Sequence, residues 1–296
     1  MDALLAAVAA AAAIAAAPPP ALGSRCGPEY AALNAHPFWF RAADGTRLDG
    51  ATFGKGRATV LFATEYPADL CRWLGFAPAI ARDGFRVFLF DFRGLGLSGS
   101  PKRASARNAY LSDLAGAAIE ARRRGNGRLL LLGASLGGTV VLTGAPRLVP
   151  QPAAVISLSG EASLTGRFPG SGLDALAAVR RLRAPLLIVG SRADSLAPET
   201  DLLRLKRAAG SREKRTLVFP GTLHGWDVLY GGPYRRRASA AIISFLRRHE
   251  PGATWVSAGA RARGPSKAAS PARPASVTGR RARSKTPRSR VPRSAR

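Results

Sequence analysis

The chain has 296 residues, 46% of them hydrophobic, so it can bury a sizeable core and is not a wholly disordered protein. Its formal net charge is +27, and the segment after residue 250 carries many Lys and Arg but no Asp or Glu. A basic surface favours polyanions or an acidic envelope as partners, although the arginine-rich composition is equally typical of a GC-rich genome.

The first 23 residues are predicted to be a secretory signal peptide or, alternatively, a disordered leader. The apolar run 3–17 is too short and too alanine-rich to span a bilayer, but it has the length of a signal h-region. Ala21-Leu22-Gly23 offers a cleavage point before Ser24, whereas the absence of Lys or Arg before the run counts against a signal. We expect a secreted or cell-envelope protein, with a cytoplasmic one as the alternative.

From residue 36 onward, short apolar runs alternate with segments of helical period. A hairpin is predicted within 38–54, turning at Asp44-Gly45, and single strands at 58–64, 85–92, 128–133, 153–159, 184–191 and 214–220. Helices are predicted at 73–83, 106–124, 136–145, 173–182, 198–209 and 234–249. This alternation predicts an α/β fold with a mostly parallel, eight-stranded sheet and helices on both faces.

The pattern divides the chain into an α/β domain, 36–250, and a tail, 251–296. The tail is rich in Pro, Ser, Ala and Arg and has almost no core-forming residues, so it is predicted to be disordered. Trp255 is its only aromatic residue, so base stacking is not expected and the tail predicts at most non-specific contact with polyanions.

The stretch "LLLLGASLGGTVVL" places Gly133-Ala134-Ser135-Leu136-Gly137 between a predicted strand and a predicted helix. Glycines two positions before and after Ser135 allow a sharp turn that presents the hydroxyl above the strand end, with helix N–H groups behind it. Ser135 is therefore a candidate nucleophile. The alternative is a small residue that merely fits where a strand meets a helix.

A serine nucleophile needs a base, and the base needs an acid that fixes its tautomer. His224 lies in a loop between the last apolar strand and the last helix, whereas His36 and His249 lie at element ends with no such setting. Asp194 follows a strand, thirty positions before His224, and is the candidate acid, with a turn or helix-capping role as the alternative.

The order Ser135, Asp194, His224, each after a strand, resembles the α/β-hydrolase family, and the resemblance extends over most of 38–249. The segment "DFRGLGLSGSP" is similar to a D-x-R-G-x-G-x-S turn that is common in that family, where a structural role beside the site is implied. The stretch "DLCRW" resembles actinobacterial secreted hydrolases of this fold. The resemblance implies a serine hydrolase of the esterase, lipase or serine aminopeptidase kind, with a Ser135–His224–Asp194 triad.

The same resemblance implies an oxyanion hole made by the backbone N–H groups of Leu136 and Tyr66. One residue pair departs from the family pattern, because Thr64-Glu65 stands where His-Gly is usual. Backbone donors do not depend on side-chain identity, so the hole can survive this change. A carboxylate that pointed inward would oppose the oxyanion, and we expect Glu65 to point away or to pair with an arginine.

Several further features bear on substrate and stability. The segment 159–185 is too short for a large lid, so the site is expected to be open and to accept short or medium acyl esters, as small molecules or as a polymer. Glu161, Phe168 and Trp226 are candidates to line it, with ordinary loop packing as the alternative. Cys26 and Cys71 either form a disulfide or remain as two buried thiols.

We expect a monomer without cofactor or metal, whose activity rises through roughly pH 6–7 as His224 loses its proton. The alternative activities on the same fold are peptidase, thioesterase and acyltransferase. An alternative of another class is a non-catalytic protein that binds polyanions or the envelope. No specific nucleic acid partner is expected.

Overall fold

The computed structural model describes residues 17–100, 109–125, 128–166 and 172–250. Most of the predicted leader and the whole predicted tail, 251–296, lie outside these residues. No helix within the described residues is long and apolar enough to cross a membrane.

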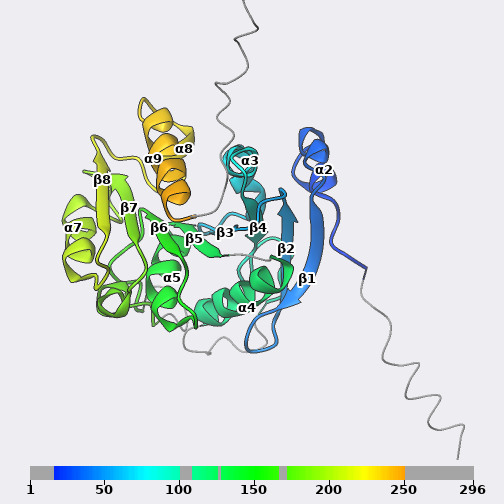
Figure 1. The fold of residues 1–296 in the computed structure, drawn as a ribbon, viewed down its shortest axis with the longest axis horizontal. Helices are drawn as coiled ribbons and strands as arrows, with labels where there is room; N and C mark the ends of the chain where they lie inside the picture. The colour runs from blue at the N-terminus through cyan, green and yellow to red at the C-terminus, as the bar shows by residue number, and fades with distance from the viewer. Residues whose placement is uncertain (1–16, 101–108, 126–127, 167–171, 251–296) are drawn as a thin grey trace, which may run out of the picture. The chain divides into compact units, whose positions relative to one another are not determined.

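An eight-stranded sheet organises the described residues (Figure 1). Its strands are β1 (His36–Arg41), β2 (Arg47–Phe53), β3 (Thr59–Ala63), β4 (Arg86–Phe90), β5 (Leu129–Ala134), β6 (Ala154–Leu158), β7 (Leu186–Ser191) and β8 (Lys214–Phe219). They lie in the order β1-β2-β4-β3-β5-β6-β7-β8. β2 is antiparallel to β1 and β4, and the remaining pairs are parallel. The predicted fold class is confirmed.

The helices alternate with the strands along the chain. The α-helices are α2 (Leu22–Arg25), α3 (Ala77–Arg82), α4 (Ala109–Arg124), α5 (Leu136–Gly144), α6 (Ala175–Ala178), α7 (Glu199–Ala208), α8 (Asp227–Tyr230) and α9 (Arg235–Arg248). The short 3-10 helices are η1 (Pro28–Leu33), η2 (Leu70–Gly75), η3 (Ala145–Arg147) and η4 (Val179–Arg181).

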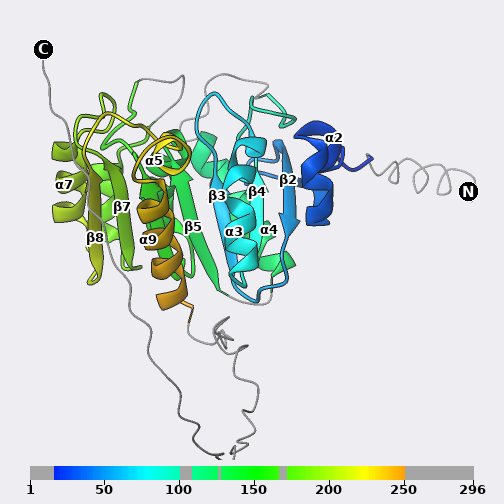
Figure 2. The ribbon, with the colours of Figure 1, turned by 90° about the horizontal axis from the view of Figure 1, so that it is seen from above.

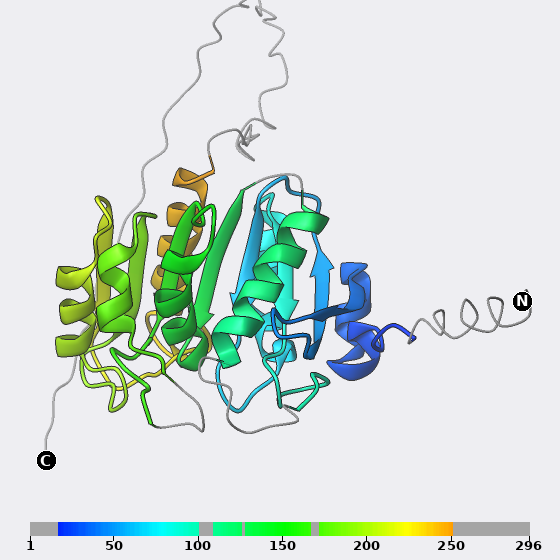
Figure 3. The same ribbon diagram turned by 90° about the horizontal axis from the view of Figure 1, so that it is seen from below.

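The two faces of the sheet bury separate hydrophobic cores. α3 and α9 cover one face (Figure 2), and α4 and α5 cover the other (Figure 3). The core under α4 and α5 includes Leu114, Val140 and Leu131, and the opposite core includes Trp73, Ile242 and Leu130. Leu130 and Leu131 are neighbours on β5 that face opposite cores, which is why this strand reads as a continuous apolar run.

Two predicted helices are shorter than the sequence indicated. The predicted helix 73–83 is divided into η2 and α3, and Pro78 stands in the first turn of α3, where a proline fits because its missing N–H is not needed. The predicted helix 173–182 begins only at Ala175, where the Asp174 carboxylate accepts the Ala177 N–H, and it ends as η4.

Candidate active site

Ser135 lies between β5 and α5 in a strained backbone conformation, with φ 49° and ψ −114°. A side chain at Gly133 would overlap the backbone of Gly137, and one at Gly137 would overlap the backbone of Ala63 and Thr64. The flanking glycines therefore allow three backbone segments to approach closely, as the predicted turn requires. Ser135 is the N-cap residue of α5, and its side chain makes no capping hydrogen bond to the helix.

The three predicted triad residues come together at the carboxyl edge of the sheet. His224 Nε2 lies 2.8 Å from Ser135 Oγ, and His224 Nδ1 lies 2.8 and 2.9 Å from the Asp194 carboxylate oxygens. In the tautomer with its proton on Nδ1, the imidazole donates to Asp194 and can accept the Ser135 hydroxyl proton.

Two backbone amides donate hydrogen bonds to the Asp194 carboxylate. It follows β7, is 1% exposed, and its Oδ1 accepts the N–H groups of Leu196 at 3.0 Å and Ala197 at 3.2 Å. This turn, in which a carboxylate accepts amides two and three residues later, is what the alternative interpretation of Asp194 predicted. The same carboxylate also contacts His224 Nδ1, and the catalytic role of Asp194 remains a prediction.

The electrostatics of the pair favour an imidazolium beside a carboxylate. Burial acts to raise the pKa of Asp194, but the hydrogen bonds from His224 and the two amides outweigh it and lower the pKa. Burial acts to lower the pKa of His224, but the hydrogen bond to Asp194 and the charges of Asp194, Glu65 and Glu161 outweigh it and raise the pKa. The proton that leaves Ser135 would therefore be well accommodated on His224.

The backbone N–H groups of Leu136 and Tyr66 have the topology that an oxyanion hole needs. Leu136 is the first residue of α5, where a helix N–H has no acceptor within the helix. Tyr66 lies just past β3, and β3 pairs with β5 in a register that sets Ala63 beside Gly133. Both loops thus leave adjacent strands at the same edge. The oxyanion role of these two amides remains a prediction.

Glu65 has a partner that the sequence did not predict. Its Oε2 accepts the backbone N–H of Trp226 at 3.1 Å, which joins it to the loop that carries His224. The expectation was that Glu65 points away or pairs with an arginine, and the hydrogen-bond partner in this structure is instead the Trp226 amide. Arg72 contributes only at longer range, by lowering the pKa of the carboxyl group.

The residues proposed to line the site have different surroundings. Glu161 is buried, and its N–H donates to Thr139 Oγ1 at 2.9 Å. Trp226 is 4% exposed, and its ring packs edge-on against Trp73 in the core, with the centroids 5.5 Å apart. Phe168 lies outside the described residues. Trp226 therefore contributes its backbone near His224, while its ring packs as an ordinary core side chain.

The turn "DFRGLGLSGSP" is tied to its neighbours by buried polar contacts. Arg93 Nη2 lies 2.6 Å from Asp113 on α4 and 2.7 Å from Asp44 in the β1–β2 turn. The Ser98 hydroxyl donates to the Asp91 carbonyl at 2.7 Å, and the Leu70 N–H donates to Asp91 Oδ1. These contacts fit the structural role that the resemblance implied, because they fix the loop beside the site.

Cys26 and Cys71 form a disulfide whose Cα atoms are 5.3 Å apart, so the alternative of two buried thiols does not hold in this structure. The neighbouring Arg25 pairs with the buried carboxylate of Asp49 on β2. Together these contacts fasten the segment before β1 to the sheet and to η2.

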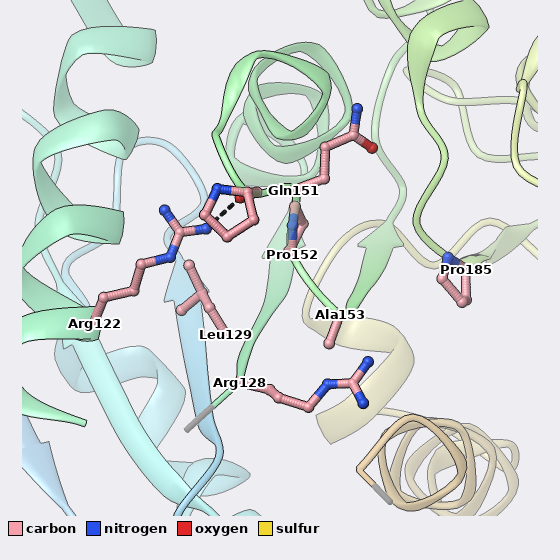
Figure 4. A pocket seen from close by; sticks show the side chains of 8 residues that line it. Arg122, Arg128, Leu129, Gln151, Pro152, Ala153 and Pro185 are labelled. Atoms are coloured by element: carbon pink, nitrogen blue, oxygen red, sulfur yellow. Dashed lines mark hydrogen bonds between the residues drawn. The ribbon is translucent and has the colours of Figure 1, made fainter. Parts of the chain in front are cut away.

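A hollow of about 570 Å³ lies away from the triad (Figure 4). Leu129 is the first residue of β5, and Ala153 and Pro185, which also line the hollow, directly precede β6 and β7. Because these strands are parallel, the hollow is at the amino edge of the sheet, whereas Ser135 is at the carboxyl edge. It takes no part in the chemistry of the triad.

No group of three or more His, Cys, Asp or Glu side chains in the described part of the chain is placed to hold a metal ion.

Two features of the site were not predicted from the sequence: the contact of Glu65 with Trp226 and the glycine at position 225. A residue with a side chain at position 225 would overlap the Glu65 carboxylate. The one signal of both in the sequence is the unusual Glu65 itself.

Comparison with known proteins gives matches over most of the fold. A family model described as the alpha/beta hydrolase fold matches residues 60–177. The uncharacterized protein YfhR of Escherichia coli (strain K12) is 28% identical over 234 residues, which cover 70% of this chain and 80% of that protein.

Two solved structures have the same fold. The esterase Pf2001 of Pyrococcus furiosus is similar with a TM-score of 0.63 and 18% identity, over 75% of this chain and 95% of that one. The monoacylglycerol lipase of Paleococcus ferrophilus is similar with a TM-score of 0.59 and 17% identity, over 69% of this chain and 99% of that one.

Proposed function

The chain has the α/β-hydrolase fold, and from its site we propose that it is a serine hydrolase that cleaves carboxylic esters with short or medium acyl chains. The observation that carries the proposal is the continuous contact from Ser135 Oγ through His224 to Asp194, on a strained turn at the end of β5. The esterase and the lipase among the similar structures support ester bonds as the substrate class.

In this mechanism Ser135 Oγ attacks the ester carbonyl while His224 Nε2 takes its proton. The amides of Leu136 and Tyr66 stabilise the oxyanion of the tetrahedral intermediate. His224 then gives the proton to the departing alcohol, which leaves an acyl group on Ser135. Water, activated by His224, releases the acid and restores the serine. Asp194 accepts the hydrogen bond from His224 Nδ1–H throughout, which keeps Nε2 directed at Ser135.

The expected openness of the site favours small and medium acyl groups. Within the described residues, the connection between β6 and β7 contains only the short helices α6 and η4. Residues 167–171 of this connection lie outside the described part, so the absence of a lid remains a prediction from the length of the segment.

The test is a substrate panel assayed with the wild type and with Ser135→Ala. The panel contains p-nitrophenyl acetate, butyrate, octanoate and palmitate, a matching acyl thioester, and an amino-acid p-nitroanilide. We expect hydrolysis of the acetate, butyrate or octanoate that exceeds the other substrates, and a loss of at least about a thousandfold in Ser135→Ala.

The following outcomes would each replace the proposal by one of the alternatives named above. Preference for the thioester or the anilide would make the protein a thioesterase or a peptidase. Transfer of the acyl group to an added alcohol in preference to water would make it an acyltransferase. No turnover of any substrate by folded protein would favour the binding protein of the polyanion or envelope kind.

A further inference from the structure

Two loops that are far apart in the sequence meet at Glu65. One follows β3 and continues to Tyr66, and the other follows β8 and carries His224. The hydrogen bond from the Trp226 N–H to Glu65 Oε2, 3.1 Å long, spans 161 positions of the chain. Trp226 is only two residues past His224, so this bond fixes the backbone of the segment that follows His224.

The two loops approach each other closely where Gly225 faces the Glu65 carboxylate. Gly225 has a φ of 51°, and a Cβ at this position would overlap the Glu65 carboxylate. A residue with a side chain would therefore meet both backbone strain and a steric clash. Any residue other than glycine at position 225 would adopt a strained positive φ and would require the Glu65 carboxylate to move.

Ring packing and a second hydrogen bond hold the same two segments together. The Trp226 ring packs perpendicular to Trp73 of η2, and the Tyr230 hydroxyl donates to the Arg72 carbonyl at 2.7 Å. These contacts hold the two loops together independently of Glu65. Glu65 adds a charged acceptor for the N–H of Trp226, two residues past His224.

Resting on the proposed function, we propose that Glu65 is a positioning residue for His224: its carboxylate fixes the loop behind the imidazole and its negative charge favours the imidazolium. This role accounts for a glutamate in the place where the family usually has a glycine. Glu65 does not contact Ser135 in this account. It acts through the loop and through its field.

The charges around the two groups define the expected pH effect. Around Glu65, burial raises the pKa of its carboxyl group, the Trp226 N–H and the charges of His224 and Arg72 lower it, Asp227 raises it, and the net shift is upward. Around His224, the charges are those of Asp194, Glu65 and Glu161, which all raise its pKa. Removal of one negative charge from this set lowers the pKa of His224.

Two substitutions separate the charge from the hydrogen bond. Glu65→Gln keeps an oxygen that can accept the Trp226 N–H but loses the charge, so the rising limb of kcat/KM should move to lower pH while the plateau kcat stays within about threefold. Glu65→Ala loses the acceptor and leaves a buried N–H unpaired. We expect its plateau kcat to fall by about 10- to 100-fold with little change in KM.

A readout that needs no activity is the titration of His224 followed by NMR in the wild type and in Glu65→Gln. The His224 resonance should titrate at lower pH in the variant, while that of His249 stays in place. The matched control is Glu120→Gln, which removes the charge of a glutamate on α4 that is bonded to Arg123 and Arg124. It should leave both His224 and the pH profile unchanged.

The proposal is overturned if His224 titrates at the same pH in the wild type and in folded Glu65→Gln, or if folded Glu65→Ala keeps the kcat of the wild type. If Glu65→Ala does not fold, the NMR titration of Glu65→Gln decides alone. Failure of the proposed function has a different signature, since wild-type protein would then show no preference for the short or medium esters although the His224 titration still shifts.

Discussion

At the scale of single residues, the proposed nucleophile Ser135 has a strained backbone conformation. A φ of 49° is unfavourable for a residue with a Cβ, and the backbone around it is too close-packed to relax. The conformation persists because β5, α5 and the end of β3 fix it from three sides. It presents the hydroxyl to His224 Nε2 at 2.8 Å.

This strain predicts that position 135 accommodates glycine better than alanine. Ser135→Gly should be more stable than Ser135→Ala by about 1 kcal/mol, because only glycine adopts a positive φ without steric cost. Both variants lose the hydrogen bond to His224, so their comparison isolates the backbone strain. Urea unfolding measures the difference. Equal stability of the two variants, or a less stable glycine variant, would show that the turn is not strained.

The residues of the triad could be predicted because their spacing reports their position. A serine between two glycines at a strand end, and an Asp and a His after later strands, must meet at one edge of a parallel sheet. The partner of Glu65 could not be predicted in this way. Its contact with Trp226 depends on how two loops pack, and neither loop has a periodicity that fixes its path.

At the scale of elements, buried charge pairs join the loop after β4 to its neighbours. Arg93 is 6% exposed, and its guanidinium lies against the fully buried carboxylate of Asp113 on α4. Burial raises the pKa of Asp113, although the hydrogen bonds and charge of Arg93 act to lower it. The pair is therefore sensitive to the loss of either partner.

Arg93→Ala should destabilise the protein by about 3–5 kcal/mol, because it leaves Asp113 buried without its counter-charge. The matched control is Arg204→Ala, which breaks an exposed pair with Asp201 on α7 and should cost less than about 1 kcal/mol. Chemical denaturation of both variants gives the two numbers. Similar costs for the buried and the exposed arginine would contradict this account of the loop.

Long periodic elements were predictable, and short ones were not. α4, α7 and α9 lie where helical periods predicted them, and all eight strands follow the apolar runs. α2, η1 and α8 span only four to six residues each, too few for a period to appear.

At the scale of the whole described fold, the segment before β1 is part of the structure. Leu22 is 2% exposed and packs in the same core as Trp73, although it lies within the predicted leader. Arg25 and Cys26 then fasten the segment through Asp49 and Cys71. The predicted cleavage before Ser24 would remove Leu22 from this core, and it remains a prediction.

The disulfide should contribute substantially to stability, since it closes a loop with a sequence separation of 45 residues. Replacement of both cysteines by serine should lower the free energy of unfolding by about 2–4 kcal/mol under oxidising conditions. Dithiothreitol should bring the wild type down to the level of the double variant and leave the variant itself unchanged. A wild type that is equally stable with and without reductant would contradict this contribution.

The account rests on Ser135 as the nucleophile, and reaction with a fluorophosphonate probe tests this most directly. Folded wild-type protein should gain one adduct, located on Ser135 by mass spectrometry, and Ser135→Ala should gain none. Labelling should rise with pH through a midpoint above the ordinary histidine pKa of about 6.5, because the pKa of His224 is raised and only its neutral form accepts the serine proton. A folded wild type that stays unlabelled, or that reacts at a residue other than Ser135, would contradict the account.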